Sequence, residues 1–317
     1  MSQQFAQISD PHLSSLAAVK AGDLRGKRVL GYISWQRRRR FEHRREVLAA
    51  LQRDLRQFHL DQLLVTGDLT HIGLPEEFRQ ARTWLQQLGS PDDIVVVPGN
   101  HDACVTADWT DTFALWRDYM ASDEDSPEAN SRSALFPSLR IRGEIAFIGL
   151  STACPKPPFM ATGTVGPEQL ARLPGLLDDA AAQGLFRVVH LHHSPLPGRE
   201  KWRKRLTDAA AVRDVIANHG AELVLNGHGH RAHCDEVATA AGNALVIAVP
   251  SASSLGLHGG GAASYNCYRV ERREQGWGLD ISARQYQRTP GESGHQGPIT
   301  GEFIEGGHTR VELPRRR

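Results

Sequence analysis

Short apolar runs alternate along the chain, up to Asn226, with stretches in which apolar residues recur every three or four positions. The first pattern is typical of buried strands and the second of amphipathic helices. Their alternation predicts a layered α/β fold. The predicted strands cover residues 5–8, 62–65, 94–97, 146–150, 187–191 and 223–225, and the predicted helices cover residues 44–58, 75–88, 167–182 and 209–218.

After Asn226 the helical pattern stops, and strand-like runs follow at residues 244–249, 265–270 and 277–287. They predict a second, more antiparallel sheet. Residues 122–131, which are acidic, and residues 289–317, which are rich in glycine and charge, are expected to be flexible. We therefore expect one domain over residues 1–288, with a basic-aromatic insertion at about residues 14–45, followed by a flexible C-terminal tail.

The composition is that of an ordinary globular protein. Of the 317 residues, 40% are hydrophobic and 23% are charged, which excludes a disordered or fibrous chain. The four cysteines are scattered without a CxxC pair, so we expect reduced thiols. The N-terminus has no secretory signal pattern, and no apolar stretch reaches the ~18 residues that cross a bilayer. We therefore expect a cytoplasmic protein.

Metal-binding side chains follow the first three predicted strands. Asp10 and His12 end the first strand, and residues two apart in an extended chain point the same way. Asp68 follows a glycine after the second strand, so its carboxylate can face outward and bridge two cations. The third strand ends in Asn100-His101-Asp102, where the amide oxygen can bind a hard cation and the histidine can titrate near neutral pH.

Two histidine pairs follow later strands. The strand at 187–191 leads into His192-His193, and His190 inside that strand is interpreted as a hydrogen-bonded core histidine. The next strand ends in Asn226-Gly227-His228-Gly229-His230, where the glycines let the backbone bring two imidazoles together. The carboxyl ends of neighbouring parallel strands meet at one edge of a sheet, so these side chains are expected to converge there.

The motifs at Asp10 and Asp68, taken alone, are more often a turn or a helix cap than a metal site. The Asn100-His101-Asp102 cluster and the glycine-flanked pair His228 and His230 are harder to explain as structural features. The joint occurrence of the motifs at five strand ends decides the matter, because every motif supplies donors suited to Mn²⁺, Fe²⁺ or Zn²⁺. We therefore predict a metal centre at this edge of the sheet.

The ordered set D-x-H, G-D, G-N-H-D, H-H and G-H-x-H resembles the motifs of the calcineurin-like metallophosphoesterase family, over roughly residues 5–250. The resemblance implies a four-layer α/β/β/α sandwich of two mixed sheets flanked by helices, with two metal ions. One ion would be held by Asp10, His12, Asp68 and His230, and the other by Asp68, Asn100, His192 and His228. Asp68 would bridge the ions, and His193 is the alternative to His192.

The resemblance also implies a reaction. Two divalent ions, with Mn²⁺ favoured, would activate a bridging hydroxide for in-line attack on phosphorus. His101 would protonate the leaving oxygen, and Asp102 would orient His101. Residues 67–78 resemble the cyclic-nucleotide phosphodiesterase branch, except that His71 stands where an aspartate is common.

Two basic segments follow candidate ligands and are expected at the rim of the site. Residues 25–45 contain nine basic residues against one acidic residue, and residues 199–205 contain five against one. Four interpretations stay open: a solvated charged face, contact with the substrate, peripheral contact with an anionic membrane on its inner face, and nucleic-acid binding. The rim candidates are Trp35, Arg37, Arg38, Arg39, Arg40, Trp202 and Arg203.

The leading functional hypothesis is a hydrolase that cleaves a phosphodiester or pyrophosphate bond. The substrate would be a nucleotide or a UDP-linked lipid, such as the UDP-2,3-diacylglucosamine that relatives with this motif set cleave. The alternatives are a 3′,5′-cyclic nucleotide phosphodiesterase, a nuclease and a non-catalytic scaffold. No additional DNA-binding domain is recognisable, and a scaffold would be expected to have lost ligands, whereas every ligand position here is occupied.

Overall fold

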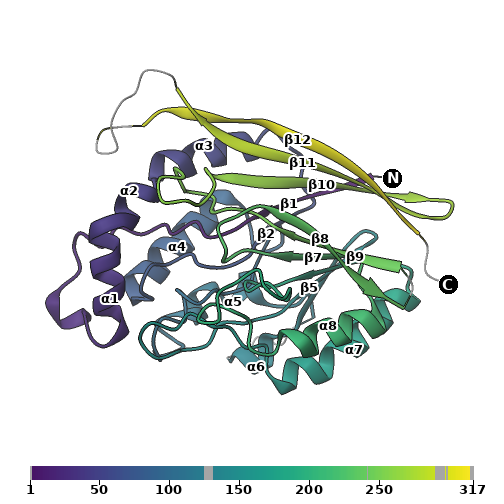
Figure 1. Ribbon diagram of the computed structural model, residues 1–317, viewed down its shortest axis with the longest axis horizontal. Coiled ribbons are helices and arrows are strands. Elements are labelled where there is room, and N and C mark those ends of the chain that lie inside the picture. The colour runs from purple at the N-terminus through teal and green to yellow at the C-terminus, as the bar shows by residue number, and fades with distance from the viewer. Residues whose placement is uncertain (1, 125–130, 241, 290–296, 298, 315–317) are drawn as a thin grey trace.

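The computed structural model describes residues 2–124, 131–240, 242–289, 297 and 299–314. Within them, two six-stranded sheets pack face to face, and helices cover both outer faces (Figure 1). This arrangement confirms the predicted α/β/β/α sandwich of two mixed sheets. The apolar cluster between the sheets contains Phe5 of the first sheet and Phe147 of the second, with ring centroids 5.2 Å apart.

The first sheet has the order β12-β11-β10-β1-β2-β3. Its N-terminal strands are parallel to one another, and β10 joins β1 in the antiparallel direction. β11 and β12 extend this antiparallel half. The strands are β1 (Ser2–Ile8), β2 (Gln62–Val65), β3 (Ile94–Val96), β10 (Ser264–Arg273), β11 (Gly276–Arg288) and β12 (Gly301–Pro314).

The second sheet has the order β4-β5-β6-β7-β9-β8. Its four central strands are parallel, and the edge strands β4 and β8 are antiparallel to their neighbours. The strands are β4 (Ser138–Arg142), β5 (Ile145–Gly149), β6 (Phe186–His190), β7 (Leu223–Asn226), β8 (His233–Thr239) and β9 (Gly242–Ala248).

The predicted long helices form the outer layers. Helices α3 (Arg45–Leu55) and α4 (Pro75–Leu88) pack on the first sheet, and α7 (Pro167–Ala182) and α8 (Ala209–His219) pack on the second. Each buries the apolar stripe that its sequence presents at three- and four-residue spacing. The shorter helices are α1 (Lys27–Ser34), α2 (Arg40–Glu42), α5 (Arg117–Met120), α6 (Arg132–Leu135), the 3₁₀ turns Ala21–Asp23 and Phe113–Trp116, and a π-helical turn at Trp35–Arg39.

Two expectations about the C-terminal region are wrong. The late strands do not form a sheet of their own, because β8 and β9 complete the second sheet, while β10 pairs with β1 and β11 pairs with β10 in the first sheet. The tail expected to be flexible contains β12, which pairs with β11 and buries Phe303 and Leu313. The apolar residues of β12 are widely spaced among glycines and charged residues, so the sequence shows no strand pattern there. Residues 290–296, 298 and 315–317 of the tail, and residues 125–130 of the acidic segment, lie outside the described residues.

The structure also bears on the cysteines and on the helices as possible membrane spans. All four cysteines are free, as expected. Within the described residues, none of the helices combines the length and the apolar character that spanning a bilayer requires.

Candidate metal centre

The loops that follow β1, β2, β3, β6 and β7 meet at one end of the two sheets. Four overlapping groups among the described residues each have ligand atoms within 4.8 Å of one another. Two of these groups combine residues from both sheets, as convergence of the strand ends predicts. The four are Asp10, His12 and His230; Asp10, Asp68 and His192; His12, Asp68 and His101; and His192, His193 and His228.

Backbone strain is concentrated at these residues. Six non-glycine residues in the described part of the chain have a positive φ, and five of them are candidate ligands. Such conformations cost about 1–3 kcal/mol each and persist where the surrounding structure enforces them, often at functional sites. The five are Asp10 (51°), His12 (42°), Asp68 (57°), His228 (65°) and His230 (53°).

The first group is arranged around Asp10. His230 Nε2 lies 3.1 Å from Asp10 Oδ1, and the backbone amide of His228 donates to Asp10 Oδ2 at 3.1 Å. His12 Nδ1 lies 3.0 Å from the carbonyl oxygen of Thr70. A carbonyl can only accept, so His12 carries its proton on Nδ1 and offers Nε2 as a ligand atom.

The second group is arranged around His192. Its Nδ1 donates to the carbonyl oxygen of Thr66 at 2.7 Å, which leaves Nε2 as the ligand atom. That Nε2 lies 3.3 Å from both Asp68 Oδ2 and Asn100 Oδ1. His228 Nε2 is buried and has no hydrogen-bond partner among the described residues. A buried polar atom without a partner is costly, and a metal ion would remove that cost.

The geometry favours His192 over His193 as a ligand. His193 uses both ring nitrogens in hydrogen bonds, with Thr152 Oγ1 at 2.7 Å and with the carbonyl oxygen of Ala161 at 3.0 Å. His192 keeps Nε2 directed at two oxygen atoms that could also bind the metal, Asp68 Oδ2 and Asn100 Oδ1. The sequence left these two histidines as alternatives because both follow the same strand.

The electrostatics of the centre favour a cation. Burial lowers the pKa of His192, but the charge of Asp68 and the bond to it, together with the charge of Asp10 and the bond to the Thr66 carbonyl, raise that pKa to about 10. Burial, followed by repulsion from neighbouring histidines, holds the pKa of His12 and His228 well below the ordinary value. These two imidazoles are therefore neutral near pH 7, which is the form that binds metals.

Comparisons with known proteins agree with this geometry. The family model for calcineurin-like phosphoesterases matches residues 4–232. The chain belongs to the calcineurin-like phosphoesterase family. Members of this family are phosphoester hydrolases that depend on two metal ions. The donor set described here, two carboxylates, one amide oxygen and several neutral imidazoles, fits such ions.

Two curated relatives of this phosphoesterase are named probable cyclic nucleotide phosphodiesterases. One, from a Synechococcus species, is 31% identical over 189 residues, which cover 58% of this chain and 63% of the relative. The other, from Vesicomyosocius okutanii, is 25% identical over 179 residues, which cover 55% of this chain and 64% of the relative. The chain therefore matches a little under two thirds of the length of each relative.

A solved structure shares the fold. A dimetal phosphatase from Danio rerio superposes with a TM-score of 0.53 and 14% sequence identity. The match covers 89% of this chain and 96% of that structure. At this identity the likeness supports the fold alone.

Asp102 does not orient His101 in this phosphoesterase, contrary to the prediction. Asp102 Oδ2 accepts the backbone amides of Asp68 and Gly99, both at 2.9 Å, and Oδ1 accepts the amide and hydroxyl of Thr70 at 2.9 and 3.0 Å. Burial and the charge of Asp68 raise the pKa of Asp102 to about 7. Asp102 therefore positions the two loops that carry Asp68 and Asn100.

His101 contacts an arginine that the sequence assigned only to the rim. The guanidinium of Arg39 lies 2.9 Å from each ring nitrogen of His101. His101 Nδ1 donates to the carbonyl oxygen of His71 at 2.6 Å, so Nε2 accepts from Arg39. Burial, and then the charge of Arg39, lowers the pKa of His101 to about 3.

The remaining rim candidates are divided between surface and interior. Arg37, Arg38 and Arg40 are exposed, whereas Trp35 is buried. Trp202 is 61% exposed, and the guanidinium of Arg203 lies 5.1 Å from the centre of its ring. Among the described residues, Arg39 is the one of the four consecutive arginines that is hydrogen-bonded to His101.

Two further histidines near the centre were not predicted as site residues. The ring of His43 lies 4.4 Å from that of His12, and the ring of His71 stacks on His12 at 5.1 Å with an interplanar angle of 6°. His43 Nδ1 is hydrogen-bonded to Ser253 Oγ at 2.9 Å. His43 follows no predicted strand, so its position in the sequence carried no signal.

His190 also differs from its prediction. It is fully buried in β6, as expected of a core histidine. Neither ring nitrogen has a hydrogen-bond partner among the described residues. Burial lowers its pKa to about 3, so the ring is neutral and packs as an apolar group.

Proposed function

We propose that this protein hydrolyses the phosphodiester bond of a small molecule at a centre of two divalent metal ions. The proposal rests on the convergence of five strained residues on one point, where the buried Nε2 of His228 has no hydrogen-bond partner among the described residues. Backbone strain and an unsatisfied buried polar atom both destabilise the fold unless a ligand compensates for them.

We assign the ligands as the motif set implies. Asp10, His12, Asp68 and His230 would hold one ion, and Asp68, Asn100, His192 and His228 the other. Bound Mn²⁺, Fe²⁺ or Zn²⁺ would lower the pKa of water and withdraw charge from the phosphate. Mn²⁺ is our first choice, since carboxylate and amide oxygens accompany the imidazoles.

His101 and Arg39 would act on the substrate from the side that faces α1 and the π-helical turn. The Arg39 fork is suited to two phosphate oxygens, and its charge would stabilise the transition state. His101 Nε2 carries no proton while it accepts from Arg39, so it would protonate the leaving oxygen only after taking up the proton that the attacking water releases. Asp102 would keep Asp68 and the backbone of Gly99 in place.

The test is metal-dependent hydrolysis of bis-p-nitrophenyl phosphate. We expect turnover with Mn²⁺ and none after chelation. His228→Ala should reduce turnover by more than ~100-fold, since loss even of an outer partner of a metal ligand costs about 10–100-fold. His308→Ala, which removes an exposed histidine on β12, is the control and should retain full activity. Equal turnover with and without metal in the parent protein would exclude the proposal.

Cyclic nucleotides are the substrate class that the curated relatives favour. We therefore expect release of a nucleoside monophosphate from a 3′,5′-cyclic nucleotide under the same conditions. The assay should also contain UDP-2,3-diacylglucosamine, whose pyrophosphate bond is chemically similar. Preference for the second substrate would reassign the protein to pyrophosphate hydrolysis.

A second candidate property is binding to an anionic membrane at the rim. Of six exposed large hydrophobic side chains among the described residues, five lie on three neighbouring segments. Lys27 Nζ donates to the carbonyl oxygen of Met160 at 2.8 Å, and the backbone amide of Ala161 donates to the carbonyl oxygen of Arg203 at 2.8 Å. The segments around Lys27, Met160 and Arg203 therefore adjoin one another. Apolar side chains beside basic ones suit an anionic membrane surface. The five are Val29, Leu30, Ile33, Phe159 and Trp202.

Flotation with vesicles tests this property. The parent protein should float with vesicles that contain phosphatidylglycerol and remain behind with pure phosphatidylcholine. The double variant Phe159→Ala and Trp202→Ala should lose flotation, whereas Ile304→Ala, an exposed residue on β12, should not. Equal flotation of all three proteins, or none of the parent, would refute membrane binding.

A further inference from the structure

A pocket of about 640 Å³ opens beside the candidate metal centre. This volume lies within the range of small-molecule sites. His12 forms part of its wall, together with His43, so the pocket adjoins the first group of ligands. The rest of the wall comes from residues 13–15, from the helical insertion and from the start of α3.

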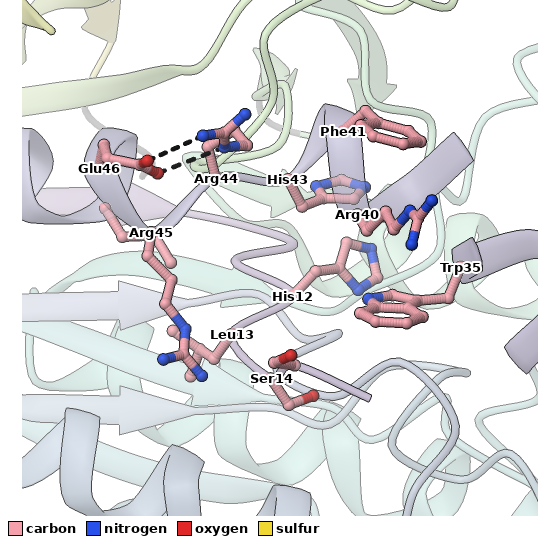
Figure 2. Close-up of a pocket in the computed structure, with 12 residues that line it drawn as sticks. His12, Leu13, Ser14, Trp35, Arg40, Phe41, His43, Arg44, Arg45 and Glu46 are labelled. Carbon is pink, nitrogen blue, oxygen red and sulfur yellow. Dashed lines mark hydrogen bonds and ion pairs between the residues drawn. The ribbon is translucent and has the colours of Figure 1, made fainter. Parts of the chain in front are cut away.

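The walls combine aromatic and cationic side chains. Figure 2 shows Trp35 and Arg40 on one side of His12, and Arg45 on the other side, beside Leu13. The guanidinium of Arg40 lies 4.5 Å from the centre of the Phe41 ring. Flat side chains with adjacent cations suit an organic group that is planar and negatively charged.

The charge of the pocket is not balanced. Arg44 is paired with Glu46, at 2.8 Å, and Glu46 is the single acidic residue in the wall. Among the described residues, Arg40 and Arg45 have no carboxylate within ion-pair distance. Two guanidinium groups are therefore available to an anion.

We propose that this pocket binds a second anionic group, a phosphate or a carboxylate, on the organic part of the substrate. The inference rests on the proposed phosphodiester hydrolysis, because it presumes that the reacting phosphodiester lies at the candidate metal centre. A 3′,5′-cyclic nucleotide has no second anion and would leave the arginines of this pocket without an anionic partner. Arg40, on the same side of His12 as Trp35, contacts the second anion, and Trp35 contacts the group between the two anions. Arg45, on the opposite side of His12, adds a second positive charge to the pocket. The pocket thereby distinguishes a singly charged diester from one with an additional charge.

Two substrates that differ by one phosphate test the proposal. Thymidine 5′-(p-nitrophenyl phosphate) has only the diester, and its 3′-phosphate derivative has a second anion. The parent protein should prefer the derivative in kcat/KM. The double variant Arg40→Ala and Arg45→Ala should reduce this preference by about tenfold, the loss expected for a charge-assisted hydrogen bond.

The control variant removes the same number of positive charges, two, from residues outside the pocket. Arg37 and Arg38 are exposed on the same insertion and do not line the pocket. The double variant Arg37→Ala and Arg38→Ala should leave the preference within about twofold of the parent, because distant exposed charges are screened. An equal loss in both double variants, or no loss in either, would overturn the proposal.

A binding measurement separates this proposal from the proposed function. Calorimetry with thymidine 3′,5′-bisphosphate and thymidine 5′-monophosphate needs no turnover. Tighter binding of the bisphosphate, lost in the Arg40→Ala and Arg45→Ala variant alone, would support the pocket even if both esters were inert. Absence of turnover would then refute the hydrolase, and equal affinity for the two nucleotides would refute the pocket.

Discussion

At the scale of single residues, the candidate ligands are held by bonds that fix their tautomers and their strained backbone. His12 and His192 each use Nδ1 on a backbone carbonyl and keep Nε2 for the centre. Glycine is required where the loops touch: a side chain at Gly99 would place its Cβ 2.6 Å from the amide nitrogen of Asp68. The site therefore depends on positioning residues as much as on ligands.

Arg39 gives the first prediction at this scale. Arg39→Ala should reduce kcat/KM for bis-p-nitrophenyl phosphate by about 100-fold, the usual cost of one lost donor to the transition state. The kcat/KM of Arg39→Lys should lie between that of the parent protein and that of Arg39→Ala, because lysine keeps the charge and loses the planar guanidinium fork. Arg38→Ala, one residue earlier and exposed, should change the rate less than about twofold. Equal effects at both positions would contradict a direct role for Arg39.

Asp102 gives the second prediction. Asp102→Asn places an amide NH₂ against backbone donors and should weaken Mn²⁺ binding by about 10–100-fold. Because Asp102 touches loops and not substrate, kcat should recover at saturating Mn²⁺. Metal titration of the activity measures both quantities, and circular dichroism verifies the fold. A loss of kcat that saturating metal does not restore would indicate a catalytic role instead.

At the scale of elements, the helical insertion is anchored to the loop after β9 by one buried carboxylate. Glu42 accepts from Ser254 Oγ at 2.5 Å and from the backbone amide of Gly256 at 2.7 Å. It also accepts from the backbone amide of Leu257 at 3.1 Å and lies 2.6 Å from His258 Nδ1. Burial opposes the charge, but these bonds outweigh burial and lower the pKa of Glu42.

The third prediction concerns this anchor. Glu42→Gln should lower the free energy of unfolding at pH 7 by about 2 kcal/mol, because hydrogen bonds to a charged acceptor are lost. Glu46→Gln, which removes a partly exposed ion pair, should cost less than about 1 kcal/mol. Urea unfolding measures both free energies.

The pH dependence of the Glu42 effect follows from its lowered pKa. The stabilisation is complete above the ordinary value of 4.5 and is lost as the pH falls through the lower pKa of the folded state. The difference between the parent and Glu42→Gln should therefore shrink in acid. A difference that stays constant from pH 7 down to pH 3 would contradict this role.

The elements predicted from sequence are those with strong periodicity. Helices α4 and α7 and strand β2 have the predicted bounds, since their apolar spacing is regular. Strands β4 and β8 were not predicted, because they lie at sheet edges where polar residues are exposed. The π-helical turn Trp35–Arg39 was not predicted either, since four consecutive arginines show no periodicity.

At the scale of the whole molecule, function depends on how the two sheets bring distant loops together. The convergence of the candidate ligands was predictable because each of them follows a strand whose end must lie at a common edge. His43 and Arg39 were not, because the insertion and its packing bring them to the centre. The antiparallel pairing of β1 with β10 was missed for the same reason, since register between distant strands is a tertiary property.

The central claim is that this fold builds a catalytic centre for two metal ions. Its most direct test is hydrolysis of bis-p-nitrophenyl phosphate by metal-free protein during stepwise addition of Mn²⁺. The account predicts no turnover at the start and a rise that ends at two Mn²⁺ per chain. Turnover in the absence of metal, or full activity at one Mn²⁺ per chain, would contradict it.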